Sequence, residues 1–68
     1  MEESIRNQLP GKVKSIMSDK VTSEVIVETS IGEIASIITT RSVQEMNLMP
    51  GDKVFALVKA TNVSVRRA

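Results

Sequence analysis

The chain contains no cysteine and no histidine, and these absences exclude much of the chemistry that small proteins perform. Without cysteine, neither a disulfide nor a thiolate metal site can form. Without histidine, the chain lacks the commonest metal ligand and the commonest general base. It also has no Gly-rich phosphate-binding loop. Glu24 and Glu28 fall on one strand face, which a solvated surface explains. We therefore predict that the protein is not an enzyme and ligates no metal ion directly.

Aromatic residues and an excess of one charge are also missing. Phe55 is the single aromatic residue, and the net charge is +1. One ring cannot form a base-stacking platform, and balanced charge gives no broad attraction to nucleic acid or to an anionic membrane. A nucleic-acid-binding module remains a rival class, but it would need a basic groove and aromatics. We expect no nucleic-acid partner.

Long apolar runs are absent as well. No stretch approaches the roughly 20 apolar residues of a membrane span. Residues 1–15 lack the basic start and apolar centre of a signal peptide. We therefore expect a cytoplasmic protein with no membrane partner.

The length of 68 residues indicates one domain, residues 1–68. A chain this short buries only about 60% of its unfolded surface, so its core is marginal. With disulfides and thiolate metal sites excluded, oligomerisation is the remaining usual route to stability. We expect a homo-oligomer whose subunits share a core.

A cluster of hydrogen-bond donors near the start of the chain is the most unusual feature present. Ser4, Arg6, Asn7 and Gln8 bring a hydroxyl, a guanidinium and two amides into five residues. Arg6 alone offers five donors in a rigid fork. Such a cluster suits an oxyanion. The alternative interpretation is a polar first strand that binds nothing.

Apolar alternation and turn signals predict five strands and one helix. The strands are expected at residues 4–17, 21–29, 33–38 or 39, 53–59 and 63–65, and the helix at residues 42–47. Ser42 and Glu45 form a Ser-x-x-Glu capping box at the start of this helix. Residues 53–59 are apolar on both faces, which predicts a central strand or one buried at an interface. The order of elements predicts an all-β fold, an OB-like five-stranded Greek-key barrel with one short helix between strands 3 and 4.

Two further places supply donors. Thr39 and Ser42 lie at the expected helix start, where free amides and the helix dipole favour an anion. Lys59, Ala60 and Thr61 end the fourth strand. Each place also has an ordinary structural interpretation: a helix cap, a strand-end charge and a turn residue.

Taken together, these places resemble the molbindin (Mop) family, small proteins that bind molybdate or tungstate. The resemblance covers nearly the whole chain and identifies it as a single molbindin-like (Mop/TOBE-type) domain. The same module recurs in molybdate-responsive regulators and molybdate-importer ATPases; the initial Met and the lack of a second domain make us expect a free-standing module. The matching motifs are Ser4-x-Arg6-Asn7-Gln8-Leu9-x-Gly11, Ile38-Thr39-x-x-Ser42-Val43, Pro50-Gly51-Asp52 and Val58-Lys59-Ala60-Thr61.

The resemblance implies an OB-like barrel, a hexamer built as a trimer of dimers, and oxyanions bound between subunits. Binding would be noncovalent, would serve storage or homeostasis, and would need no organic cofactor. The implied side-chain ligands are Ser4, Arg6, Lys59 and Thr61 of one subunit with Thr39 and Ser42 of a neighbour, and backbone N–H groups of Ile5 and Ala60 add to them.

The start of the chain departs from the family pattern. Ile5 stands where the family usually has Ala, and Glu2 and Glu3 stand where a basic or an apolar residue is common. Ile5 crowds the backbone beside the ion, and two carboxylates repel a dianion. These departures keep open an alternative: a ligand-free structural or regulatory oligomerisation module of OB type. We expect molybdate binding to be retained.

Overall fold

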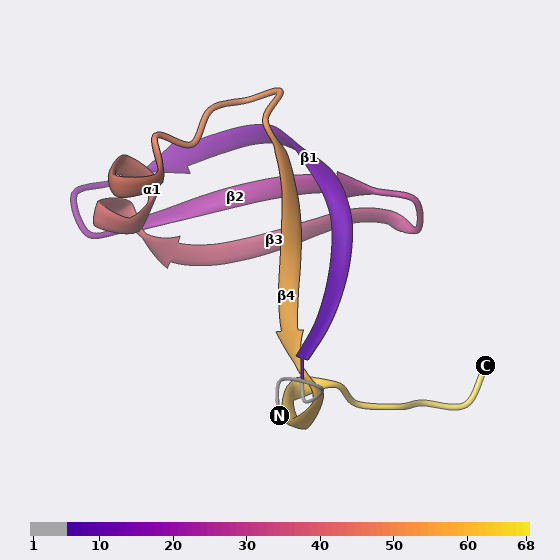
Figure 1. The fold of residues 1–68 in the computed structure, drawn as a ribbon. Helices are drawn as coiled ribbons and strands as arrows, with labels where there is room; N and C mark the ends of the chain where they lie inside the picture. The colour runs from indigo at the N-terminus through magenta and orange to yellow at the C-terminus, as the bar shows by residue number, and fades with distance from the viewer. Residues whose placement is uncertain (1–5) are drawn as a thin grey trace.

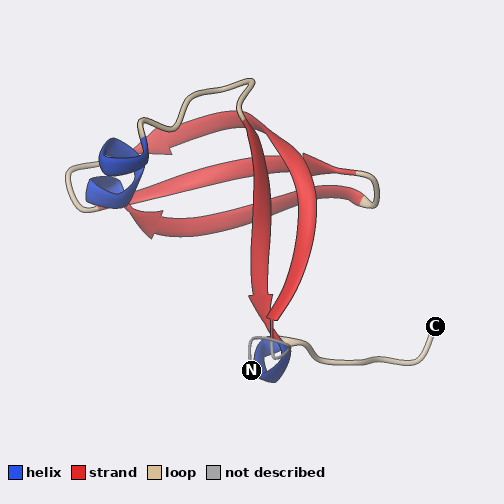
Figure 2. Cartoon of the chain, viewed as in Figure 1, coloured by secondary structure: helices blue, strands red, loops and turns tan. Residues whose placement is uncertain are grey.

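The computed structural model describes residues 6–68, in which one antiparallel sheet and one short α-helix form the fold (Figures 1 and 2). Short polar turns join the first three strands, and the helix lies between the third and fourth. The expected all-β fold with a helix at this position is confirmed. In chain order the elements are β1 (Arg6–Ser18), β2 (Thr22–Thr29), β3 (Gly32–Thr39), α1 (Thr40–Met46), β4 (Lys53–Lys59) and a 3-10 turn, η2 (Ala60–Asn62).

The strand order is β3-β2-β1-β4. Three consecutive strands are followed by a fourth that returns to lie beside the first, which is the Greek-key order. β1 pairs with β4 through its first half and with β2 through its second half, and it curves strongly between them (Figure 1). As a result, the β1–β4 ladder projects away from the hairpin of β2 and β3.

The bend in β1 is built around Gly11. This residue pairs with Thr29 of β2 and with Val54 of β4. A Cβ atom at Gly11 would lie 2.5 Å from the Glu28 carbonyl oxygen and 2.6 Å from Val27 Cγ1. Only glycine permits this close approach. A register shift between Val13 and Ser15 adds a bulge just beyond it, and bulges bend a strand.

The core is small and consists of valines on the neighbouring strands β1 and β2. Val13, Val25 and Val27 are buried, with exposed fractions of 1%, 3% and 4%. Half-buried apolar side chains surround them: Ile16, Ile38, Val43, Leu48 and Val54. Many large apolar side chains remain in solvent, including Phe55 at 63% and Val65 at 93% exposure. A core of three valines leaves much apolar surface for partners.

The turn between β1 and β2 is held by Asp19. Its carboxylate accepts hydrogen bonds of 2.8 Å from the N–H groups of Val21 and Thr22. The bonds from Thr22 and Val21 lower the pKa of the Asp19 carboxyl, because they stabilise its charged form. The turn therefore gains stability above the usual aspartate pKa, and this gain is lost as pH falls through the lowered one.

The predicted fifth strand is not formed in the described chain. Residues 63–65 follow η2 as irregular backbone that leads away from the sheet (Figure 1). β3 and β4 are the two edges of the sheet and do not pair, so the barrel is open. A cavity of 380 Å³ lies along this open seam, and both edge strands line it. β4 is therefore an edge strand, and the prediction of a central strand is wrong. The alternative prediction, a strand buried at an interface between subunits, fits its two apolar faces.

The helix begins earlier than the capping-box pattern predicted. It spans Thr40–Met46, and Thr39 is its N-cap rather than Ser42. Glu45, the expected capping partner, instead pairs with Arg41, with 3.2 Å between Nε and Oε2. The helix is capped at its C-terminus by Asn47, whose φ of 51° is a left-handed conformation that asparagine tolerates. The prediction was wrong because Thr39 and Ser42, three residues apart, each begin a pattern that resembles a helix cap.

Candidate functional site

The structure brings two of the predicted donor groups together at one end of the β1–β4 ladder. The backbone of Arg6 lies opposite Lys59 in the antiparallel register. Ala60 and Thr61 follow directly in η2, so the opening motif and the Lys-Ala-Thr motif meet there. Ser4 and Ile5 lie outside the described residues. The strand register, rather than sequence proximity, therefore juxtaposes residues more than fifty positions apart.

Lys59 borders a cavity of 360 Å³ that Leu57, Val58 and Asn62 also line. Asn62 was not among the residues singled out from the sequence. Its place directly after the Lys-Ala-Thr motif, and its side-chain amide, could have indicated it. An ammonium and an amide therefore border the same concave surface.

The third donor group forms a hydrogen-bonded pair at the start of α1. The Ser42 N–H donates to Thr39 Oγ1 over 3.0 Å, and the Thr39 hydroxyl donates to Ser42 Oγ over 2.8 Å. The Thr39 proton and the Ser42 amide are thus both engaged. Among the described residues, no acceptor is assigned to the Ser42 hydroxyl proton. The Ser42 hydroxyl proton is therefore the donor of this pair that could serve another molecule, and the hydrogen bond from Thr39 polarises it.

This arrangement changes how the helix start could bind an anion. The sequence predicts that free amides and the helix dipole attract the anion here. The helix has only seven residues, and its N-cap already occupies the Ser42 N–H. Side-chain hydroxyls, rather than the dipole, are the relevant donors.

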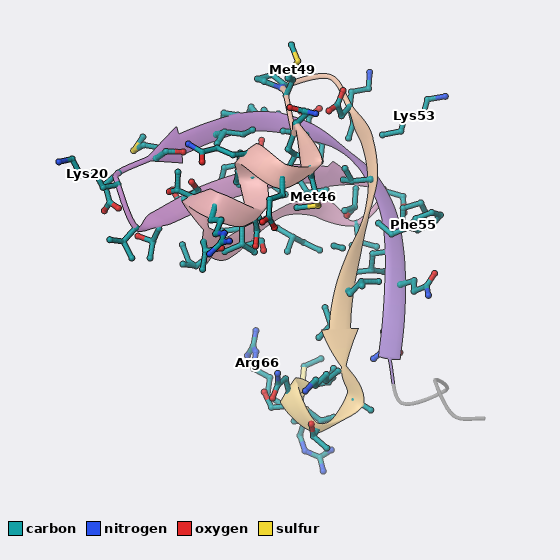
Figure 3. All side chains as sticks on the ribbon, turned by 60° about the vertical axis from the view of Figure 1, so that its left-hand side comes forward. Lys20, Met46, Met49, Lys53, Phe55 and Arg66 are labelled. Atoms are coloured by element: carbon teal, nitrogen blue, oxygen red, sulfur yellow. The ribbon has the colours of Figure 1, made fainter. Side chains whose placement is uncertain are left out.

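The donor groups at the two ends of the fold do not meet within one chain. Figures 1 and 3 both show α1 well separated from the end of β4, where η2 begins. Thr39 and Ser42 lie at one end, and Lys59 and Thr61 at the other. One copy of the chain therefore cannot assemble the full set of predicted ligands around one ion.

The chemistry of the predicted ligands is uniform, because each is a donor and none is acidic. Within residues 6–68, no group of three or more His, Cys, Asp or Glu side chains could hold a metal ion. In the same part of the chain, no helix is long and apolar enough to cross a membrane. A donor-only set of cations, hydroxyls and amides suits an oxyanion.

The fold and the predicted donor residues are typical of a small β-domain that binds oxyanions. Comparison with known proteins supports this class. The TOBE domain model matches residues 3–65, and the chain belongs to this family, among relatives named molybdenum-pterin-binding proteins. The family predicted from the motifs is confirmed.

Three relatives illustrate the similarity. Molybdenum-pterin-binding protein 2 of Clostridium pasteurianum is 42% identical over 66 residues, covering 96% of this chain and 97% of that protein. A molybdate-binding protein from Sporomusa ovata has a similar structure, with a TM-score of 0.90 and 40% identity over 98% of this chain and 100% of that one. ModG is described as a cytoplasmic molybdate-binding protein and was solved with molybdate bound. Its structure has a TM-score of 0.81 and 40% identity, and the match covers 91% of this chain and 45% of the ModG chain.

Proposed function

We propose that this protein binds molybdate and tungstate noncovalently at subunit interfaces, for storage or homeostasis in the cytoplasm. It performs no catalysis and carries no organic cofactor. The proposed ligands remain those implied by the motifs: Ser4, Ile5 (N–H), Arg6, Lys59, Ala60 (N–H) and Thr61 of one subunit with Thr39 and Ser42 of another. The cytoplasmic location and the molybdate cargo are supported by the descriptions of its relatives.

The observation that carries the proposal is the position of Arg6 opposite Lys59. Two positively charged residues at the end of one ladder offset the two charges of a molybdate dianion. Each charge-assisted hydrogen bond contributes about 1.5–3 kcal/mol net. Hydroxyls at Ser42 and Thr61 supply donors from other directions. Because none of these groups is a carboxylate, the proton of an anion such as hydrogen phosphate would find only hydroxyl oxygens to accept it, and the site should favour fully deprotonated anions.

The proposed assembly is a homo-oligomer, a hexamer built as a trimer of dimers, and the exposed surface supports association. The chain of 7.4 kDa exposes 5631 Å². Folded monomers of this mass expose about 4,200 Å². The radius of gyration is 13.0 Å, whereas a compact chain of this length has about 11 Å. Exposed apolar side chains on β4, such as Phe55 and Leu57, are natural interface residues.

The fifth strand of the barrel belongs to this assembly. Residues 63–65 alternate apolar and polar side chains, and they leave the sheet without a partner strand in the described chain. The open seam between β3 and β4 offers two unpaired edges over an apolar cavity. Unpaired edges are templates for another strand. A copy's C-terminal segment therefore closes the seam of a neighbouring copy.

A direct test is calorimetric titration of the purified protein with molybdate, tungstate and sulfate. We expect heat with molybdate and tungstate, and a molybdate-dependent rise in the melting temperature. At a free concentration of 100 times Kd, binding adds about 2.7 kcal/mol to stability. Absence of heat with all three anions would contradict the proposed function. Monomers that persist at saturating molybdate, together with a raised melting temperature, would contradict binding between subunits.

Val65→Asp should dissociate the oligomer. Val65 is 93% exposed in one copy, and a carboxylate at this position cannot enter an apolar seam without a large desolvation cost. Native mass spectrometry should show monomers or small species for Val65→Asp. Val65→Thr is the matched control, because it keeps the β-branched shape and should remain assembled. An intact oligomer for Val65→Asp would show that the C-terminal segment lies outside the interface.

A further inference from the structure

The start of α1 is attached to the β1–β2 turn by a chain of side-chain hydroxyls. Ser18 Oγ lies 2.6 Å from Ser23 Oγ, and Ser23 Oγ lies 2.8 Å from Thr40 Oγ1. The Thr40 hydroxyl donates to the Asp19 carbonyl oxygen over 2.8 Å. The Thr40 N–H also donates to the Val21 carbonyl oxygen over 2.9 Å. Thr40, the first residue of the helix, is therefore fixed by its side chain and by its backbone.

The direction of this chain follows from counting protons. A threonine hydroxyl has one proton, and Thr40 gives it to the Asp19 carbonyl. Ser23 must therefore donate to Thr40, and Ser18 must donate to Ser23. Each hydroxyl in the chain has its proton accepted, and Ser23, although only 2% exposed, is fully satisfied. A directed, satisfied and partly buried chain of this kind holds its members in one geometry.

The helix has few other means of holding its position. It has seven residues, none of them buried, and a helix of two turns is not stable by itself. Val43, and Leu48 just beyond the helix, are only half-buried against the core. The hydroxyl chain is thus a main constraint on the helix start, where Thr39 and Ser42 lie on either side of Thr40.

We propose that Thr40 and Ser23 are positioning residues for the oxyanion site, because they fix the direction in which the Ser42 hydroxyl donates. This inference rests on the proposed function and deepens it. Neither residue touches the ion. Thr40 fixes the first turn of the helix, the Thr39–Ser42 pair follows that turn, and Ser23 holds Thr40 from the sheet. The site therefore depends on the β1–β2 turn, which is distant in sequence from every ligand.

The test is a double-mutant cycle on molybdate affinity, measured by calorimetry. Thr40→Val removes the hydroxyl and keeps the shape of the side chain. We expect about a tenfold loss of affinity, the lower end of what loss of an outer hydrogen-bond partner costs at metal sites. In a Ser42→Ala background, Thr40→Val should cause a much smaller loss, since the hydroxyl that it orients is gone and only Thr39 remains of the pair. Thr40→Ser restores the hydroxyl and should restore the affinity.

Thr22→Val is the matched control. Thr22 begins β2 directly after the same turn, and within residues 6–68 the one hydrogen bond from its hydroxyl goes to the Asp19 carboxylate over 3.4 Å. This variant should bind molybdate as the wild type does. If Thr40→Val does not fold, Ser18→Ala tests the outer end of the same chain, and we expect a smaller loss that Ser42→Ala also removes.

Two outcomes would overturn the inference. Unchanged affinity in folded Thr40→Val would show that the chain does not orient the site. An equal loss in the wild-type and Ser42→Ala backgrounds would show a general structural effect. In both cases the wild type still binds, and the proposed function stands. Absence of molybdate binding by the wild type itself would overturn the proposed function and this inference with it.

Discussion

Lys59→Ala should weaken molybdate binding on the order of 10- to 100-fold while the oligomer stays intact. The substitution removes a charge-assisted donor worth about 1.5–3 kcal/mol, and each 1.4 kcal/mol changes Kd tenfold. Lys59 is exposed at the end of β4, so its loss costs the fold little. Arg6→Ala should have a similar or larger effect, because Arg6 is the only guanidinium in the opening motif. Calorimetric titration gives the affinity and native mass spectrometry gives the assembly state.

Lys53→Ala is the matched control for Lys59→Ala. Lys53 lies on the same strand at its other end, and it is exposed in the same alternating pattern. Figure 3 shows its side chain and that of Phe55 on the side of β4 that faces away from α1. Its removal should leave the affinity unchanged. Unchanged affinity in Lys59→Ala and Arg6→Ala as well, with assembly intact, would show that molybdate binds away from these two residues. Absence of binding by the assembled wild type would favour the rival function of a ligand-free oligomerisation module.

Gly11→Ala should destabilise the protein strongly. A methyl group at Gly11 would lie within 2.6 Å of both the Glu28 carbonyl oxygen and Val27 Cγ1. The backbone oxygen cannot move without breaking the β1–β2 ladder, and overpacking of this kind costs about 1–3 kcal/mol. For a domain of this size, each kcal/mol lowers the melting temperature by about 4–8 °C. Thermal unfolding followed by circular dichroism measures the shift.

Whether Gly11→Ala lowers or raises the melting temperature distinguishes two roles of this glycine: room for the close approach of the β2 backbone, or conformational freedom alone. Where space allows, replacing glycine by alanine stabilises a protein by about 0.4–1 kcal/mol, because the unfolded chain loses freedom. A raised melting temperature for Gly11→Ala would therefore contradict the tight bend. Lys12→Ala, at the neighbouring exposed position, is the control and should change the melting temperature little.

The strands and the motifs were readable from the sequence because both are local patterns. Alternating β-branched residues predicted the β2–β3 hairpin, and the apolar run at residues 53–59 predicted β4 with the bounds that the structure shows. The missing cysteine and histidine, with balanced charge, left oxyanion binding as the chemistry best supported. The family was recognisable because its motifs are short and contiguous.

The predictions of the helix N-cap and of the fifth strand were wrong because each depends on a choice between two structures that the local sequence favours equally. Thr39 and Ser42 both fit an N-cap, and only the path of β3 into the helix selects Thr39. Residues 63–65 read as a strand, yet a strand exists only where an edge is available to pair with it. In the described chain the segment leads away from the seam, so no edge of this copy pairs with it.

By itself, the sequence determined the order of the first four strands and the helix, and the family, and it predicted a set of donor residues, because these follow from local periodicity and motif spacing. The tertiary structure alone decided that the backbone of Arg6 lies opposite Lys59, since strand register joins positions distant in the chain. It also decided that Thr39 and Ser42 lie away from them, and that Ser23 and Thr40 join the helix start to the β1–β2 turn. Hydrogen bonds and close packing between distant segments set these relations, and no local pattern encodes them.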